Sequence, residues 1–118
     1  MSAELIARLE AATEGSAALD VHIELAIRGI ARQEPRVPDY TTSLDAALTL
    51  WDTPDIGHDY PRRGINLFYA VLPGGKMAWN ANAWELKDGS SVILRLGQAD
   101  HRSRPISACI AALKARAA

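Results

Sequence analysis

The chain has 118 residues, of which 48% are hydrophobic and 23% are charged, and its thirteen basic and fourteen acidic side chains leave a formal net charge of −1. These values are typical of one globular domain over residues 1–118, and they exclude a wholly disordered chain. The near-neutral charge argues against a nucleic-acid partner, because such proteins carry a basic surface. The single cysteine excludes an internal disulfide and a multi-cysteine zinc site.

No segment has the run of about eighteen apolar residues that a membrane span needs. Residues 1–6 lack the cationic start and the unbroken apolar run of a signal peptide. The sequence therefore predicts a cytoplasmic protein with no membrane partner, in which Cys109 stays reduced. Cys109 lies on an apolar helical stripe, which favours a buried structural role over a nucleophilic one.

The first half of the chain predicts three helices. Apolar side chains recur at helical spacing over residues 2–12, 16–30 and 43–51. Ser16 can cap the second helix, and Gly29 lies near its end. Thr42 and Asp45 resemble a capping box at the start of the third helix.

The second half predicts an antiparallel sheet and one more helix. The predicted elements are strands near 65–72, 76–86 and 91–97 and a helix over 104–117. Short turns between successive strands favour an antiparallel meander. The first strand carries apolar residues on both of its faces, which indicates that helices cover both sides. The predicted fold class is α+β, with an antiparallel sheet of about three strands covered by helices on both faces as an α-β-α sandwich.

Residues 52–64 form a predicted loop that contains a candidate metal site. Its side chains are Asp52, Asp55, His58 and Asp59, whose oxygen and imidazole groups could hold a divalent cation. Their spacing matches no established metal motif, so a solvated acidic loop is the alternative interpretation. No metal or cofactor is predicted from the rest of the chain.

The segment from Trp79 to Trp84 is a candidate binding surface. It includes Asn80 and Asn82, so aromatic stacking and amide hydrogen bonds could act together. The alternative is that both tryptophans are core residues. The two rings are five positions apart, which places them on opposite faces of an unbroken strand. A bulge between them would bring both rings to one face.

Three further candidate binding residues stand at the start of the last predicted helix. They are His101, Arg102 and Arg104, and the free N–H groups of a helix N-terminus together with two arginines could bind an anion. A charged turn without a ligand is the alternative. The sequence contains neither a nucleophile elbow nor a phosphate loop.

Three segments resemble small bacteriophage and prophage proteins that carry the phage ABA sandwich domain. They are residues 5–11 (Leu-Ile-Ala-Arg-Leu-Glu-Ala), 40–50 (Tyr-Thr-Thr-Ser-Leu-Asp-Ala-Ala-Leu-Thr-Leu) and 104–116, an alanine-rich helix. The resemblance covers about half of the chain. It implies α-β-α layers and a phage or prophage origin, with residues 52–72 longer and more charged than expected. It implies no catalytic residues.

The resemblance and the absence of a catalytic motif favour a non-enzymatic accessory protein that acts in a bacterial host cell. Its partner would be a host or phage protein or a small ligand. Two alternatives are a virion structural or assembly component, for which a homo-oligomer is possible, and a small metal-dependent enzyme that uses the loop with Asp52, His58 and Asp59.

Overall fold

The structure is a computed structural model, and it describes residues 3–29, 37–51, 63–86 and 93–117. The candidate metal loop, including Asp52, Asp55, His58 and Asp59, lies outside the described residues. The elements in chain order are α1 (Ala3–Ala11), α2 (Ala17–Arg28), α3 (Leu44–Leu48), the 3-10 turn η1 (Thr49–Trp51), β1 (Arg63–Val71), β2 (Met77–Leu86), β3 (Ile93–His101) and α4 (Arg104–Ala117).

The three strands form one antiparallel sheet in the order β1-β2-β3, which confirms the predicted meander. The strand β3 continues beyond the predicted end at residue 97 as far as His101. Its last residues alternate in burial, with Ala99 and His101 buried and Gln98 and Asp100 exposed. Polar side chains are uncommon in strands, so the sequence did not predict a strand over residues 98–101. Pairing with β2 extends β3 through these residues.

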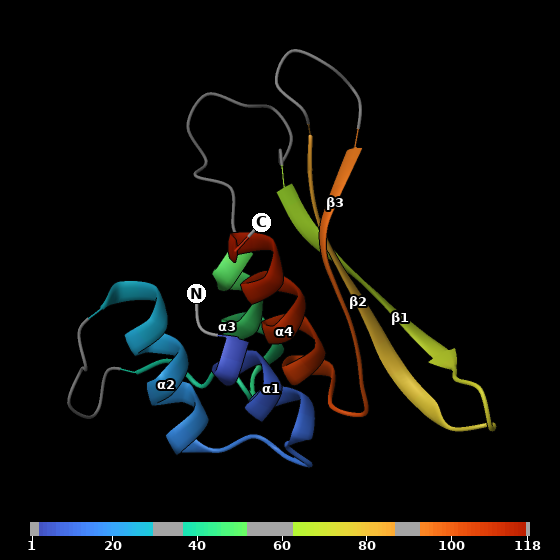
Figure 1. Cartoon of the computed structure of the whole chain (residues 1–118), viewed down its shortest axis with the longest axis horizontal. Coiled ribbons are helices and arrows are strands. Elements are labelled where there is room, and N and C mark those ends of the chain that lie inside the picture. The colour runs from blue at the N-terminus through green and yellow to red at the C-terminus, as the bar shows by residue number, and fades with distance from the viewer. Residues whose placement is uncertain (1–2, 30–36, 52–62, 87–92, 118) are drawn as a thin grey trace.

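All described helices lie on one side of the sheet (Figure 1). The helix α4 packs against β3 and β2, and nine of its fourteen residues are buried. It approaches β3 closely, because a Cβ added at Gly97 would lie 2.8 Å from the backbone nitrogen of Ala115. The α+β class with an antiparallel sheet is therefore confirmed, whereas the described residues contain helices on only one face.

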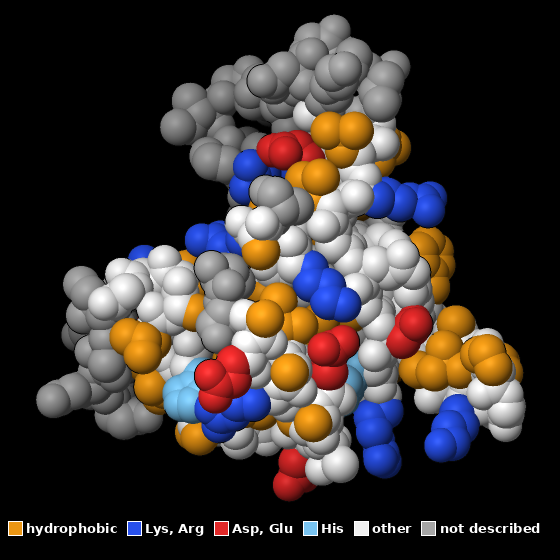
Figure 2. Space-filling view, in the orientation of Figure 1, with side chains coloured by type: hydrophobic (Ala, Val, Ile, Leu, Met, Phe, Trp, Pro, Cys, Tyr) orange, Lys and Arg blue, Asp and Glu red, His pale blue; other side chains and the backbone are white. Residues whose placement is uncertain are grey.

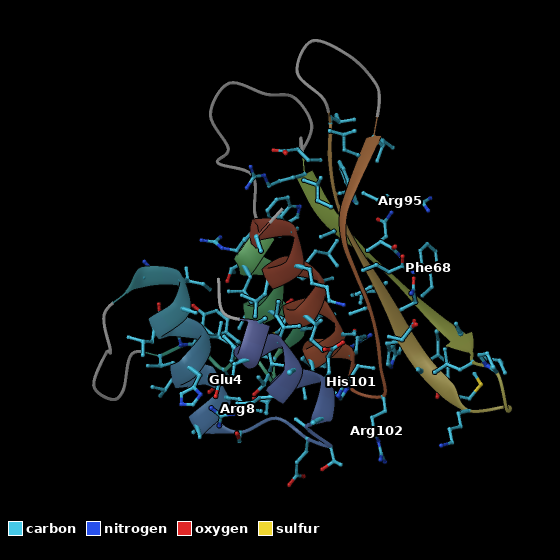
Figure 3. The ribbon with its side chains drawn as sticks, viewed as in Figure 1. Glu4, Arg8, Phe68, Arg95, His101 and Arg102 are labelled. Atoms are coloured by element: carbon cyan, nitrogen blue, oxygen red, sulfur yellow. The ribbon has the colours of Figure 1, made fainter. Side chains whose placement is uncertain are left out.

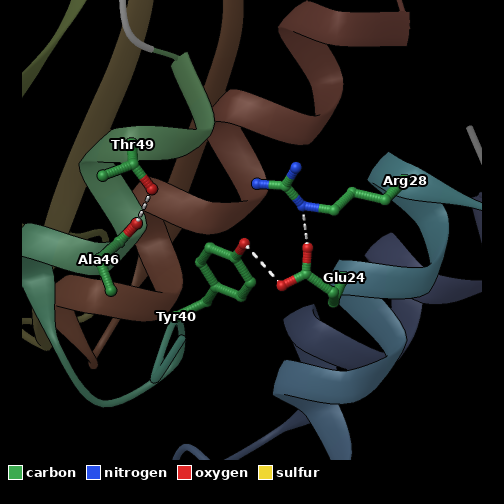
Figure 4. A network of polar contacts seen from close by, with 5 residues as sticks. All are labelled: Glu24, Arg28, Tyr40, Ala46 and Thr49. Carbon is green, nitrogen blue, oxygen red and sulfur yellow. Dashed lines mark hydrogen bonds and ion pairs between the residues drawn. The ribbon is translucent and has the colours of Figure 1, made fainter. Parts of the chain in front are cut away.

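The helix α2 is attached to the segment before α3 by buried polar contacts. Asp20 accepts hydrogen bonds from the backbone N–H and the hydroxyl of Thr41, at 2.8 and 2.7 Å. Buried Glu24 forms an ion pair with Arg28 and accepts a hydrogen bond from the Tyr40 hydroxyl at 3.2 Å (Figure 4). Burial, followed by the nearby charge of Glu24, raises the pKa of Tyr40.

The helix ends follow the predicted signals with one correction. Ser16 caps α2, and Gly29 ends it in a left-handed conformation with a φ of 70°. The cap of α3 is Ser43, whose hydroxyl accepts from the Ala46 N–H, so the predicted capping box at Thr42 is wrong. The backbone N–H of Thr42 instead bonds to Asp39, which places Thr42 in the preceding turn.

Candidate binding surfaces on the two faces of the sheet

Trp79 and Trp84 lie on opposite faces of the sheet. The strand β2 pairs with β1 without interruption from Met77 to Leu86. A bulge is present, but its extra residue is Leu96 in β3, because Ala83 pairs with Gly97 while Trp84 pairs with Arg95. The parity of β2 is therefore kept, and the prediction for an unbroken strand is confirmed. Both tryptophans are half-buried rather than fully enclosed.

Trp79 belongs to an aromatic cluster on the helix side. Its cross-strand neighbour is Tyr69, with the ring centroids 4.8 Å apart and the planes tilted by 43°. The guanidinium carbon of Arg104, at the start of α4, lies 5.1 Å from the centre of the Trp79 ring. Such contacts favour a fixed orientation of both the ring and the cation.

The turn end of the β1–β2 hairpin extends beyond the N-terminal end of α4 (Figure 1). Tyr69 is therefore 57% exposed, and the next cross-strand pair, Val71 and Met77, is 66% and 44% exposed. Figure 2 shows hydrophobic side chains gathered at this end, with basic side chains close by. We call Tyr69, Val71, Met77, Trp79 and Arg104 the hairpin surface.

The opposite face of the sheet carries Asn80, Asn82 and Trp84. Asn82 donates from Nδ2 to Oδ1 of Asn80 at 2.6 Å, and Asn80 donates from Nδ2 to Oδ1 of Asp100 at 2.8 Å. The Trp84 indole lies over Gly64, and its Nε1 is buried with no hydrogen-bond partner among the described residues. We call this face the open face, since none of the described helices covers it. Its exposed side chains include Asn66, Phe68, Arg95, Gln98 and Asp100.

His101 is a structural residue and does not join the exposed arginines. It is buried, its Nδ1 accepts from the Ser103 N–H at 2.9 Å, and its Nε2 lies 2.8 Å from the carbonyl of Ala12. An accepting Nδ1 requires the neutral tautomer with hydrogen on Nε2, which then donates to Ala12. Arg102 is exposed and points away from the helices (Figure 3).

The candidate surface from the sequence is therefore divided in three. Trp79 and Arg104 contact each other on the helix side, whereas Asn80, Asn82 and Trp84 lie on the open face. His101 fastens the end of α1. Sequence reasoning missed Tyr69, Val71 and Met77, although the apolar residues on both faces of β1 were the available signal.

Two hollows lie outside both the hairpin surface and the open face. The first is a groove of about 310 Å³ between α1 and α2, where Arg8 donates to Nδ1 of His22 beside Glu4 and the exposed Leu25 (Figure 3). The second has about 390 Å³ and includes Trp51, Arg63 and Glu85. There Arg63 stacks on the Trp51 ring and pairs with Glu85 at 2.8 Å, so these charged groups satisfy each other.

The described residues hold no group of three or more His, Cys, Asp or Glu side chains that could bind a metal ion. Cys109 is buried, which confirms the prediction for this residue, and its thiol donates to the carbonyl of Tyr40. Burial raises the pKa of the Cys109 thiol far above its usual value, so the thiol stays protonated. None of the described helices is long and apolar enough to span a membrane.

No family model, curated protein or solved structure matches this chain, so the geometry alone supports a proposal for its function.

Proposed function

We propose that this chain is a non-enzymatic binding module that recognises an acidic, apolar segment of a partner protein through the hairpin surface. The observation that carries the proposal is the exposure of Tyr69, Val71 and Met77 on one face of a hairpin end. Contiguous exposed apolar side chains are unfavourable in water and are typical of interaction sites. The proposal is supported by residue type as well, because Tyr, Trp and Arg contribute most to binding energy at interfaces.

Charge around the hairpin surface favours an acidic partner. Arg104 stacks on Trp79 and forms one side of the surface. Exposed Lys76 precedes Met77 in the hairpin turn, and exposed Arg102 follows the end of β3 (Figure 3). Asp100 belongs to the open face and is engaged by Asn80. An aspartate or glutamate in the partner would bind these basic groups, whereas a lysine-rich segment would be repelled.

A random peptide library displayed on beads and selected on the intact protein tests the proposal. We expect selected peptides to be enriched in Asp or Glu next to aromatic or branched residues. The double variant Tyr69→Ala, Trp79→Ala should weaken binding of a selected peptide at least tenfold. Phe68→Ala is the matched control, because Phe68 is equally exposed at 57% but lies on the open face. Peptides that bind the double variant as tightly as the parent would contradict the proposal.

The groove between α1 and α2 supports a second candidate, a small-ligand site. It combines apolar Leu5 and Leu25 with the polar Arg8 and His22, the mixture that small-molecule sites use. The affinity for a ligand held there should fall in Arg8→Ala and stay unchanged in Trp79→Ala. The two candidates are thereby separated with a single pair of variants.

The accessory role in a phage or prophage, the virion role and the α-β-α sandwich stay predictions. The metal-dependent alternative has its own test, in which zinc or manganese is added during thermal unfolding. A saturable rise in melting temperature that Asp52→Ala with His58→Ala abolishes would favour the enzyme, since a ligand bound only to the folded state stabilises it.

A further inference from the structure

The open face is organised in levels across the three strands. Strand pairing places Phe68, Asn80 and Asp100 side by side at one level, and Gly64, Trp84 and Arg95 at another. The level between them consists of amides only, namely Asn66, Asn82 and Gln98.

The two outer levels are complementary to each other. One carries the exposed Phe68 on β1, and the other has Gly64 on β1 beneath the indole of Trp84. On β3, one carries the acidic Asp100 and the other the basic Arg95, both exposed. Figure 3 shows Phe68 and Arg95 on the side of the sheet turned away from the helices. Charge therefore reverses across the amide level.

We propose that a second copy of this chain docks on the open face. The two sheets would be related by a two-fold axis that lies between them, perpendicular to the strands, at the level of Asn82. Rotation about this axis reverses the strand direction. The level with Phe68 and Asp100 in one copy then lies opposite the level with Gly64 and Arg95 in the other. Such an interface uses the same patch on both copies.

In this arrangement the side chains of each level contact complementary side chains of the other copy. Phe68 of one copy packs on the Trp84 indole that lies over Gly64 of the other. Arg95 of one copy faces Asp100 of the other, and this pair occurs twice because of the symmetry. The central amides face identical amides, which both donate and accept hydrogen bonds. Two face-packed sheets keep their strands within about 30° of each other, so contacts near the axis stay aligned.

The size of the face sets the strength of the dimer. Three strands about 4.8 Å apart, with nine residues rising about 3.3 Å each, cover a footprint of about 430 Å². A stable interface of standard size buries about 800 Å² on each partner, so the face supports a weak, concentration-dependent dimer. We expect a dissociation constant on the order of 10–100 µM, in line with small transient interfaces.

Sedimentation velocity of the full chain over roughly 5–500 µM, a range chosen to span this constant, tests the proposal. The parent should shift from monomer to dimer within this range. Arg95→Asp and Asp100→Arg should each weaken self-association at least tenfold, because each places like charges opposite each other. An equimolar mixture of the two variants should recover the dimer, since opposite charges then face each other at both contacts. Lys76→Asp, a charge reversal in the hairpin turn, is the matched control and should dimerise like the parent.

Phe68→Glu is a second variant that leaves both charges and the Asn80–Asp100 hydrogen bond in place, and it should also be monomeric. Far-UV circular dichroism confirms that each variant is folded. A parent that stays monomeric at the highest concentration would overturn the proposal. Failure of the mixed variants to re-associate, or a dimer that no open-face variant weakens, would assign self-association to another surface. Trp79→Ala should leave the dimer intact, so this result is separable from peptide binding at the hairpin surface.

Discussion

Replacing Gly97 with alanine is expected to destabilise the protein through the backbone of α4. Gly97 is buried on β3 and faces this helix. An added Cβ would lie 2.8 Å from the Ala115 nitrogen and 3.0 Å from the Ala111 carbonyl carbon, and still closer to the Ala111 oxygen. All three are backbone atoms, so no side-chain rotation can relieve the overlap. Strand and helix must therefore separate.

The magnitude follows from two opposed terms. Inserting a methyl group into a well-packed contact costs about 1–3 kcal/mol, and the high end applies where backbone must move. Alanine also restricts the unfolded chain, which stabilises the folded state by about 0.4–1 kcal/mol. The steric term is larger, so we expect a net loss of about 2–2.5 kcal/mol. At about 4 °C per kcal/mol for a chain of this length, the melting temperature should fall by about 8–10 °C.

Thermal and urea unfolding followed by circular dichroism measure this loss. Gln98→Ala is the control, because the neighbouring Gln98 is exposed on the open face and its truncation should change stability by less than about 0.5 kcal/mol. Equal stability of Gly97→Ala and the parent would refute the close approach of β3 and α4.

Three further predictions concern the core beneath the sheet. Leu113→Ala should lower the free energy of unfolding by about 2–5 kcal/mol in urea titrations, because this leucine of α4 is fully buried; a loss below about 0.5 kcal/mol would mean that α4 is peripheral. The thiol of Cys109 should react with Ellman's reagent only as the protein unfolds, because it is buried and its pKa is raised; rapid reaction under native conditions would contradict its placement. Because the pKa of Tyr40 is raised in the folded state, the stability that this group contributes is present below about pH 10 and is lost as the pH rises through the folded pKa. Tyr40→Phe should reduce the loss of unfolding free energy at alkaline pH, measured by urea unfolding at several pH values. If the variant loses as much stability at alkaline pH as the parent, Tyr40 is not responsible.

Periodicity along the chain determined the elements. The final helix was predicted over the residues that α4 occupies, because its apolar side chains recur at a spacing of three and four. Opposite faces for Trp79 and Trp84 followed from an odd separation on a continuous strand. Local capping was less certain from sequence, because Thr42 and Ser43 are adjacent residues with equivalent side-chain chemistry, and only the hydrogen bond to Ala46 distinguishes them.

Tertiary structure alone decided which residues are exposed together. The apolar residues on both faces of β1 indicated a sheet covered on both sides, yet the described helices lie on one side and leave Phe68 exposed. Tyr69 is exposed for a different reason, since it lies on the helix side but beyond the N-terminal end of α4. The sequence grouped His101 with the arginines as one candidate site, yet its ring bonds to Ala12, 89 residues away in the chain. Alternation along a strand says which side chains share a face, whereas the length and position of the opposing helix decide which of them water reaches.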